Sequence, residues 1–220
     1  FDVLIYLAMN SKNYTRTFLD SSYEKGMIIS LEKKYFHHEI NVLRKKDGDK
    51  FILFDGKGNS SLCKVIEINR KHFSLEIIKL FEPSLREGIE IELGQSLIKN
   101  DPFNFSIQKA TELGVKKFSP IISERVVIKG KRSDSTSREE KWRQIAQGAC
   151  EQCGENWIPE ISSPLDIKEW SETVSSKTKI VLFPNAEARL SDIEIQDSVS
   201  IAIGPEGDFT EKEISYLKES

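Results

Sequence analysis

The chain has 220 residues and a mass of 25.2 kDa, enough for one full hydrophobic core or two smaller ones. Its 38% hydrophobic content, 30% charged content and net charge of -3 exclude a collagen-like chain, a disulfide scaffold, a disordered tail and a generally basic nucleic-acid coat protein. The longest apolar stretch, residues 1–9, is shorter than the roughly 20 residues of a membrane helix and lacks the basic start of a secretory signal. Together with an odd number of cysteines, three, this predicts a cytoplasmic protein without membrane contact.

The first part of the chain is predicted to be rich in β-strands. Residues 50–55 and 62–68 are short alternating runs, and the turn-forming residues 55–59 between them predict a hairpin. A third run, residues 72–80, follows closely, which favours a small β-barrel over a βαβ unit. One helix is expected in this part, over residues 34–43.

From Pro83 onward the pattern changes to strands that alternate with amphipathic helices, which predicts a second, α/β domain. Strands are expected at residues 89–98, 118–122, 180–183 and 199–203. The last two are short apolar runs, typical of parallel strands that are fully buried.

Three helices of the second domain carry start signals. These signals are Asp101 with Pro102 as N-cap and first-turn proline, Ser137 with Glu140 as a capping box, and Thr210 with Glu213 as a second capping box. Gly114 and Gly154 are expected to end the first two helices. Apolar residues from Trp142 to Cys153 recur at helical spacing and predict a buried helix face.

The last two predicted strands each end in a turn that contains proline. Residues 182–186 (Leu-Phe-Pro-Asn-Ala) include one turn and residues 203–207 (Ile-Gly-Pro-Glu-Gly) the other. Adjacent parallel strands would bring both turns to one edge of the sheet, where open α/β sheets bind ligands. A tight turn without further function is the other interpretation of each turn. Neither turn has the phosphate-loop pattern or the dinucleotide pattern, so neither ATP nor NAD is predicted.

Two other groups of residues have both a chemical and a structural interpretation. Cys150 and Cys153 have the spacing of a zinc or redox pair, but the pair falls late in a helix and the other possible ligands lie in the first domain. Helix packing is the better interpretation, and no metal is predicted. The adjacent His37 and His38 suit a metal or proton transfer, but in a small β domain they are more often structural. No serine, histidine and aspartate set indicates hydrolysis by a triad.

Several motifs follow one another along most of the chain. The first part has Arg16-Thr17-Phe18, His37-His38, Val42-Leu43-Arg44, Gly48-Asp49 and Leu53-Phe54-Asp55-Gly56. The second part has residues 108–115, 123–127, 142–146, 151–152, 158–161 and 203–207. In this order and at these spacings the motifs resemble the RsmE family, the bacterial 16S ribosomal RNA uridine-N3 methyltransferases of the SPOUT superfamily.

The resemblance implies a fold and an activity. The expected fold is an N-terminal PUA-like small β-barrel that binds RNA, residues 1–82, followed by a SPOUT-type α/β methyltransferase domain, residues 83–220, of a class with a trefoil knot. The expected activity is S-adenosylmethionine-dependent methylation of N3 of a uridine in small-subunit (16S) ribosomal RNA, by a homodimer that acts in ribosome biogenesis on this RNA or on the assembled small subunit. A sulfonium donor leaves as a neutral thioether, so this transfer needs alignment of the reactants more than an oxyanion hole.

The resemblance also implies site residues. The cofactor is expected to bind at Leu182, Phe183, Pro184, Gly204, Pro205, Glu206 and Gly207. RNA contacts are expected from Arg44, Arg125, Lys129, Lys131, Arg132 and Gln152, most of them near a stretch, residues 125–143, with seven basic and three acidic residues. The general base is unknown; Glu206 is the nearest candidate by position, and capping of the following helix is an equally good interpretation of its carboxylate.

Three features depart from the family pattern. Asp208 stands where the family commonly has the second glycine of Gly-Pro-Glu-Gly-Gly-Phe, and Glu155 stands where it has an arginine. Family members continue past the position of Ser220 through Leu-Gly and Arg-x-Glu-Thr-Ala motifs that thread the knot and complete the cofactor pocket, so this segment is expected to be missing here. Residues 1–8 are expected to be either an upstream extension or an added leader.

Two alternatives to the expected activity stay open. One is a non-catalytic RNA-binding or ribosome-binding protein on the same fold, which Glu155 in place of the arginine favours. The other is a related methyltransferase that acts on another nucleotide or on transfer RNA.

Overall fold

The computed structural model describes residues 14–32, 45–69, 72–126, 135–186 and 188–219. The chain forms two compact units, residues 1–86 with 151–157, and residues 87–150 with 158–220. Residues 151–157 therefore lie with the first unit, far along the chain from the rest of it. The expected domain boundary near Pro83 stays a prediction. Among the described helices, none is long and apolar enough to cross a membrane.

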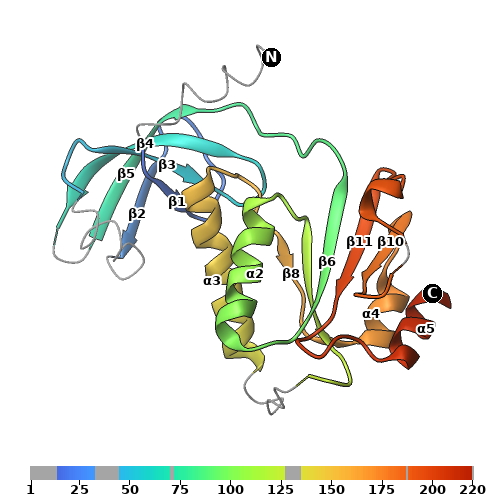
Figure 1. Ribbon diagram of the computed structural model, residues 1–220. Helices are drawn as coiled ribbons and strands as arrows, with labels where there is room; N and C mark the ends of the chain where they lie inside the picture. The colour runs from blue at the N-terminus through green and yellow to red at the C-terminus, as the bar shows by residue number, and fades with distance from the viewer. Residues whose placement is uncertain (1–13, 33–44, 70–71, 127–134, 187, 220) are drawn as a thin grey trace. The chain divides into compact units, whose positions relative to one another are not determined.

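The first unit is built on a five-stranded sheet (Figure 1). Its strands are β1 (Arg16–Phe18), β2 (Ile28–Glu32), β3 (Lys50–Phe54), β4 (Ser60–Ile68) and β5 (His72–Leu80), in the order β1-β3-β4-β5-β2. The predicted β3–β4 hairpin is confirmed, and only the β1–β3 pair in this sheet is parallel. The curled sheet agrees with the expected small barrel. The helix expected over residues 34–43, with His37 and His38, lies outside the described residues.

Alternating side chains of these strands form the core of the first unit. They are Ile29, Phe51, Leu53, Cys63, Val65, Phe73, Leu75 and Ile77. The Cys63 thiol is fully buried among them, and this burial raises its pKa to about 12. The thiol is therefore neutral at physiological pH, as expected of a packing residue and not of a redox site.

Residues 151–157 are tied to β1 and to the β3–β4 turn of the first unit. The Glu151 carboxylate accepts a hydrogen bond from the Phe18 N–H at 3.0 Å, and the Asn156 side chain accepts one from the Arg16 guanidinium. The Trp157 indole N–H donates to the Ser84 carbonyl at 2.9 Å. This segment thus adds hydrogen bonds to a sheet whose strands end about seventy residues earlier in the chain.

Glu155 shapes the turn within this segment. Its Oε1 atom accepts the backbone N–H groups of Asn156 and Trp157, at 2.8 and 3.1 Å. An arginine at this position has no acceptor for these donors. Glu155 thus has a structural role in the first unit.

The second unit is a parallel sheet with helices on both faces. Its strands are β6 (Glu90–Ser96), β7 (Lys117–Ile122), β8 (Glu160–Ile161), β9 (Leu165–Asp166), β10 (Thr178–Leu182) and β11 (Ser198–Ile203), in the order β10-β11-β6-β7-β8 with β9 also on β7. Its helices are α2 (Asn100–Glu112), α3 (Ser135–Cys153, whose last three residues belong to the first unit), α4 (Ile167–Thr173) and α5 (Glu211–Glu219), with a 3₁₀ turn η4 (Leu190–Asp192).

The two faces of this sheet have separate cores. Phe103 and Ile107 of α2 and Trp142 of α3 pack on one face, against Phe118 of β7. Trp170 of α4 and Ile214 of α5 pack on the other face with Ile121 and Ala202, and Figure 1 shows these two pairs of helices on opposite sides of the sheet. The expected α/β class is therefore confirmed for this unit.

Two predicted helix starts are wrong. Helix α2 has Lys99 as N-cap, without a side-chain bond, so Asp101 lies in the first turn, where its charge suits the helix dipole. Helix α3 begins at Ser135, so Ser137 and Glu140 do not form the cap. The sequence offers several N-cap residue types in a row here, so the capping signal at Ser137 does not fix where the helix begins.

Two burial predictions are also wrong. Cys150 is buried as expected, but Cys153 is exposed because α3 reaches its end there. Strand β10 is parallel but only partly buried, because it is an edge strand of the sheet that the described residues form. Gly114 and Gly154, with positive φ, follow the ends of α2 and α3 as predicted.

Candidate functional site

The two proline-containing turns lie at the same edge of the sheet in the second unit. Strands β10 and β11 are parallel neighbours, and Leu182 is paired with Ile203 at their carboxyl ends. The turns that begin at these residues therefore start side by side. This is the adjacency that the sequence predicted.

A cavity of about 520 Å³ lies at these strand ends, within the size range of ligand pockets, roughly 300–1,000 Å³. It is lined by Lys179, Ile180, Val181, Leu182, Phe183, Pro184, Ala186, Ala188, Leu190, Ile193, Ile203, Gly204 and Asp208. Four of the predicted cofactor residues, Leu182, Phe183, Pro184 and Gly204, are thus brought together. The other three predicted residues, Pro205, Glu206 and Gly207, lie in the same loop but do not line this cavity.

The loop after β11, residues 204–210, is held by side chains from β6 and from the end of β7. Gln95 of β6 is 5% exposed, and its amide N–H lies 3.5 Å from the Gly204 carbonyl oxygen. The Arg125 guanidinium donates to the Gly207 carbonyl at 2.6 Å. Within the loop, the Asp208 N–H donates to the Pro205 carbonyl at 3.0 Å. The path of the loop is therefore fixed both by side chains of other elements and by a hydrogen bond between two of its own residues.

Glu213 is the third side chain that holds this loop. Its carboxylate, 8% exposed, accepts the Thr210 N–H at 2.8 Å and the Thr210 hydroxyl at 3.0 Å. The Glu213 N–H in turn lies 3.3 Å from the Thr210 hydroxyl, so the predicted capping box is confirmed. The other carboxylate oxygen accepts the Glu124 N–H at 2.8 Å. One buried carboxylate thus joins the start of α5 to the residues that follow β7.

Two backbone positions of this loop have special requirements. A Cβ atom on Gly204 would lie 3.0 Å from the Phe209 backbone nitrogen, tighter than ordinary contacts. Asp208 has a φ of 56°, in the left-handed region that favours glycine. This chain has the glycine common in the family at the first position and departs from the family pattern at the second.

The predicted RNA contacts are distributed over several places. Arg125 is exposed, and its guanidinium binds the Gly207 carbonyl of the cofactor-side loop. Gln152 is exposed at the end of α3. Arg44, Lys129, Lys131 and Arg132 lie outside the described residues. The bond from Arg125 to this loop was not predicted from the sequence, and its RNA contact stays a prediction.

The candidate base Glu206 is exposed, and the interpretation of its carboxylate as a helix cap is not supported. The first backbone donor before α5, the Thr210 N–H, binds Glu213 instead. No group of three or more potential metal ligands occurs in the described ranges of the chain.

Sequence reasoning missed two polar residues of the site, besides residues of its wall such as Leu190 and Ile193. Gln95 is one, and its signal is a polar residue at the end of a buried strand. Asp208 is the other: the sequence marked it as a departure, but not as part of the cavity wall. Both contacts join residues that are distant in sequence or depend on loop geometry, so periodicity could not reveal them.

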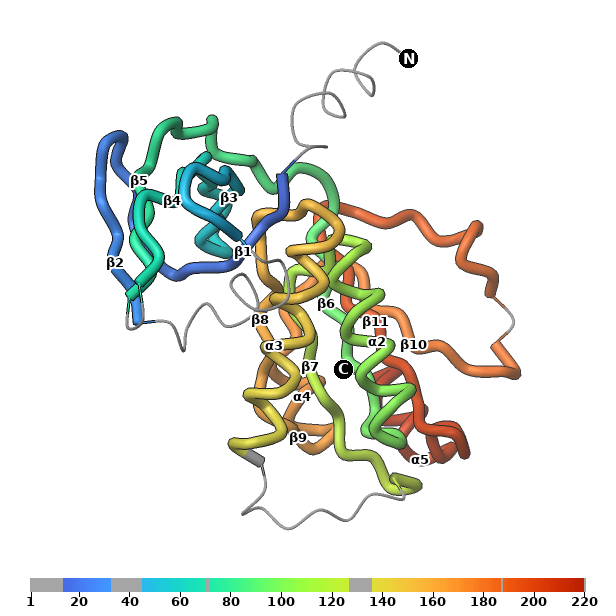
Figure 2. Tube along the Cα trace, turned by 90° about the vertical axis from the view of Figure 1, so that its left-hand side faces the viewer, coloured from blue at the N-terminus to red at the C-terminus, as the bar shows by residue number. Residues whose placement is uncertain are grey.

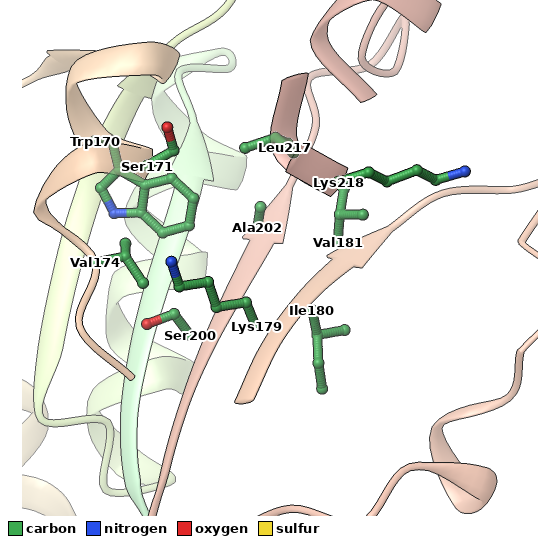
Figure 3. Close-up of a pocket in the computed structure, with 10 residues that line it drawn as sticks. All are labelled: Trp170, Ser171, Val174, Lys179, Ile180, Val181, Ser200, Ala202, Leu217 and Lys218. Atoms are coloured by element: carbon green, nitrogen blue, oxygen red, sulfur yellow. The ribbon is translucent and has the colours of Figure 1, made fainter. Parts of the chain in front are cut away.

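A second cavity, of about 320 Å³, lies on the sheet face between α4 and α5 (Figure 3). Its walls include Trp170, Val174, Ala202 and Leu217, and it shares residues 179–181 of β10 with the first cavity. The second cavity is away from the strand ends and is mainly apolar. The strand-end cavity therefore remains the better candidate for a site of chemistry.

Comparisons with known proteins show the family to which both parts of the chain are similar. Sequence profiles match residues 86–220 as an RNA methyltransferase domain and residues 31–78 as an RNA methyltransferase PUA domain. The Buchnera aphidicola (subsp. Schizaphis graminum) protein named ribosomal RNA small subunit methyltransferase E is 35% identical over 208 residues, 94% of this chain and 85% of that protein. The Bacillus subtilis protein of the same name is 26% identical and covers 89% of this chain and 80% of its own length.

Solved structures that are similar to this chain are also methyltransferases. The Neisseria gonorrhoeae ribosomal RNA small subunit methyltransferase E, bound to S-adenosylmethionine, is similar with a TM-score of 0.88 and 29% identity, over 94% of this chain and 86% of that one. A putative methyltransferase from Legionella pneumophila, also in complex with S-adenosylmethionine, has a TM-score of 0.89 and 28% identity over the same shares. The PUA-like and SPOUT-type methyltransferase folds expected from the sequence are therefore confirmed.

Proposed function

The chain belongs to the ribosomal RNA small subunit methyltransferase E (RsmE) family, and from this we propose that it transfers the methyl group of S-adenosylmethionine to small-subunit ribosomal RNA. The observation that carries the proposal is the cavity at the joined ends of β10 and β11, with its fixed Gly204–Thr210 loop. Methyl transfer from a sulfonium needs a donor and an acceptor held in line, and a pre-formed loop provides that alignment.

The residues of the cavity fit S-adenosylmethionine. Leu182, Leu190, Ile193 and Ile203 offer apolar surface suited to a purine base, and Gly204 leaves the backbone open where a Cβ atom would crowd it. Asp208 provides a carboxylate for a hydroxyl or cationic group. When bound, S-adenosylmethionine supplies the activated methyl group. Gln95, Arg125 and Glu213 would then hold the loop in place.

The finer part of the proposal concerns the acceptor. We propose N3 of a uridine in 16S ribosomal RNA as the atom that is methylated, with Glu206 as the candidate base for its proton because this carboxylate is exposed in the loop beside the cavity. Arg44, Lys129, Lys131, Arg132 and Gln152 are proposed to contact the RNA, in a cytoplasmic homodimer that takes part in ribosome biogenesis. The barrel is proposed to bind RNA and the α/β domain to carry the transfer.

Calorimetric titration of S-adenosylmethionine into the full-length protein tests the cofactor. Methyl transfer from labelled S-adenosylmethionine to unmodified small subunits, followed by mass spectrometry of the nucleosides, tests the acceptor. We expect binding and the appearance of N3-methyluridine. Absence of cofactor binding would overturn the enzymatic proposal and favour a non-catalytic RNA-binding protein. A different methylated nucleoside, or modification of transfer RNA alone, would overturn only the proposed acceptor.

A further inference from the structure

Asp208 is the residue of the cavity wall that departs from the glycine common in the family. It lies in the loop between β11 and α5, is exposed, and lines the strand-end cavity together with Gly204 and Ile203. None of the hydrogen bonds or ion pairs found among the described residues involves its carboxylate. The carboxylate therefore has no partner among the described residues that would compete with a ligand.

The backbone of Asp208 is held in a conformation that does not favour a side chain. Its φ is 56°, and its N–H is fixed by the Pro205 carbonyl at 3.0 Å. A left-handed backbone disfavours residues with a Cβ atom, although aspartate and asparagine tolerate it better than most. An observed backbone outlier at a binding site is a reason to look for a function of the side chain.

Few charged residues line the cavity, and the Arg125 guanidinium nearby is bonded to the Gly207 carbonyl. The described residues that line the cavity include two charged ones, Asp208 and Lys179. Lys179 lies near the start of β10 and also lines the second cavity, where Figure 3 shows its side chain extending toward Trp170. Much of the rest of the strand-end wall is apolar, which strengthens the interaction of a carboxylate with a cation there.

We infer that the Asp208 carboxylate contacts the bound cofactor and makes the site selective for its charge. This inference rests on the proposed function. S-adenosylmethionine carries a positive sulfonium that becomes a neutral thioether in S-adenosylhomocysteine when the methyl group leaves with its bonding electrons remaining on sulfur. A negative side chain in the cavity favours the cationic donor over the neutral product. Methyl transfer itself thus removes part of the attraction and promotes product release.

The test is calorimetric measurement of the dissociation constants of S-adenosylmethionine and S-adenosylhomocysteine for the full-length protein and for Asp208→Asn. Asparagine keeps the size and the tolerance of a left-handed backbone while it removes the charge. We expect Asp208→Asn to weaken S-adenosylmethionine about three- to five-fold, the size of an exposed ion pair, and to change S-adenosylhomocysteine less than two-fold. The difference should shrink in 0.5 M salt.

Glu211→Gln is the matched control, because Glu211 is an exposed carboxylate three residues away that does not line the cavity. It should leave both dissociation constants within two-fold. Equal weakening of both ligands by Asp208→Asn, or no weakening, would overturn the inference. A wild-type protein that binds neither ligand would instead overturn the proposed function, so the two failures are distinguishable. Thermal unfolding without ligand confirms that each variant is folded.

Discussion

The two loops that form the strand-end cavity are held in different ways. The loop after β11, residues 204–210, is bonded to Gln95, Arg125 and Glu213, side chains from outside the loop. The loop after β10, residues 183–193, has hydrogen bonds that stay within it among its described residues, such as the Ala186 N–H to the Phe183 carbonyl at 3.1 Å. Figure 2 shows this second loop as a wide excursion from the sheet.

The two loops should therefore respond differently to a ligand and to substitution. A loop fixed by buried polar groups is pre-organised and needs little ordering when a ligand binds. A loop with exposed apolar side chains, such as Leu190 at 58% exposure, gains contacts only when a ligand covers it. We therefore expect substitutions in the first loop to affect stability and binding together, and substitutions in the second to affect binding alone.

The largest effect is expected from Glu213→Ala. It removes a buried acceptor and leaves the N–H groups of Thr210 and Glu124 without their partner, which should cost about 2–3 kcal/mol. In a protein of this size the melting temperature should fall by roughly 5–10 °C. Differential scanning calorimetry measures it, with Glu219→Ala, an exposed carboxylate at the other end of α5, as the control. Similar shifts for both variants would show that the hydrogen bonds of the Glu213 carboxylate are unimportant for stability.

A smaller loss is expected from Gly204→Ala, and Gly207→Ala provides a matched comparison within the same loop. The new methyl group at 204 would press on the Phe209 backbone nitrogen at 3.0 Å, whereas at 207 it would meet the Arg125 side chain at an ordinary 3.5 Å. We expect Gly204→Ala to lower the free energy of unfolding by about 1–3 kcal/mol, measured in urea, and Gly207→Ala to change it by much less. The reverse order would contradict this account of the loop.

Arg125→Ala separates two roles of one side chain. If the guanidinium mainly holds the Gly207 carbonyl, its removal weakens S-adenosylmethionine binding in the absence of RNA, by about three- to ten-fold. We expect this weaker binding of S-adenosylmethionine, and calorimetric titration measures its dissociation constant. If it mainly contacts RNA phosphate, the salt dependence of RNA affinity falls by about one unit of slope instead. Lys141→Ala, an exposed basic residue of α3, controls for general charge.

The smallest effect on stability is expected from Leu190→Ser in the loop after β10. Leu190 is largely exposed, so its replacement should change the free energy of unfolding by less than about 0.5 kcal/mol. The cavity would still lose apolar wall, and we expect S-adenosylmethionine affinity to fall about two- to five-fold. A fall in stability as large as that of Gly204→Ala would remove the distinction between the two loops.

Local patterns predicted the elements of the fold well. The alternation of residues 50–55 and 62–68 predicted the β3–β4 hairpin, and the spacing of Thr210 and Glu213 predicted the start of α5, because hydrophobic alternation and capping depend on neighbouring residues. The exposure of β10 was not predicted, because an edge position depends on strand order and not on the strand itself.

Contacts between residues that are distant in sequence were the part of the site that could not be predicted. The turns after β10 and β11 were expected to meet, because parallel adjacency follows from fold class. The bond from Arg125 to Gly207 joins residues 82 positions apart, and the sequence indicated Arg125 as an RNA contact and not as a residue that holds this loop. The attachment of residues 151–157 to the first unit also depends on contacts between residues far apart in sequence, and it was not predicted.

That attachment has a consequence for synthesis of the protein on the ribosome. The five barrel strands are complete at Leu80, but the residues that bind Arg16 and Phe18 of β1 follow only from Glu151 onward. At about 5–20 residues per second, the roughly seventy intervening residues take about 4–14 s to make. During that time the nascent barrel has its own core but not its last hydrogen-bonding partners, so its assembly is finished only when more than two thirds of this chain has been translated.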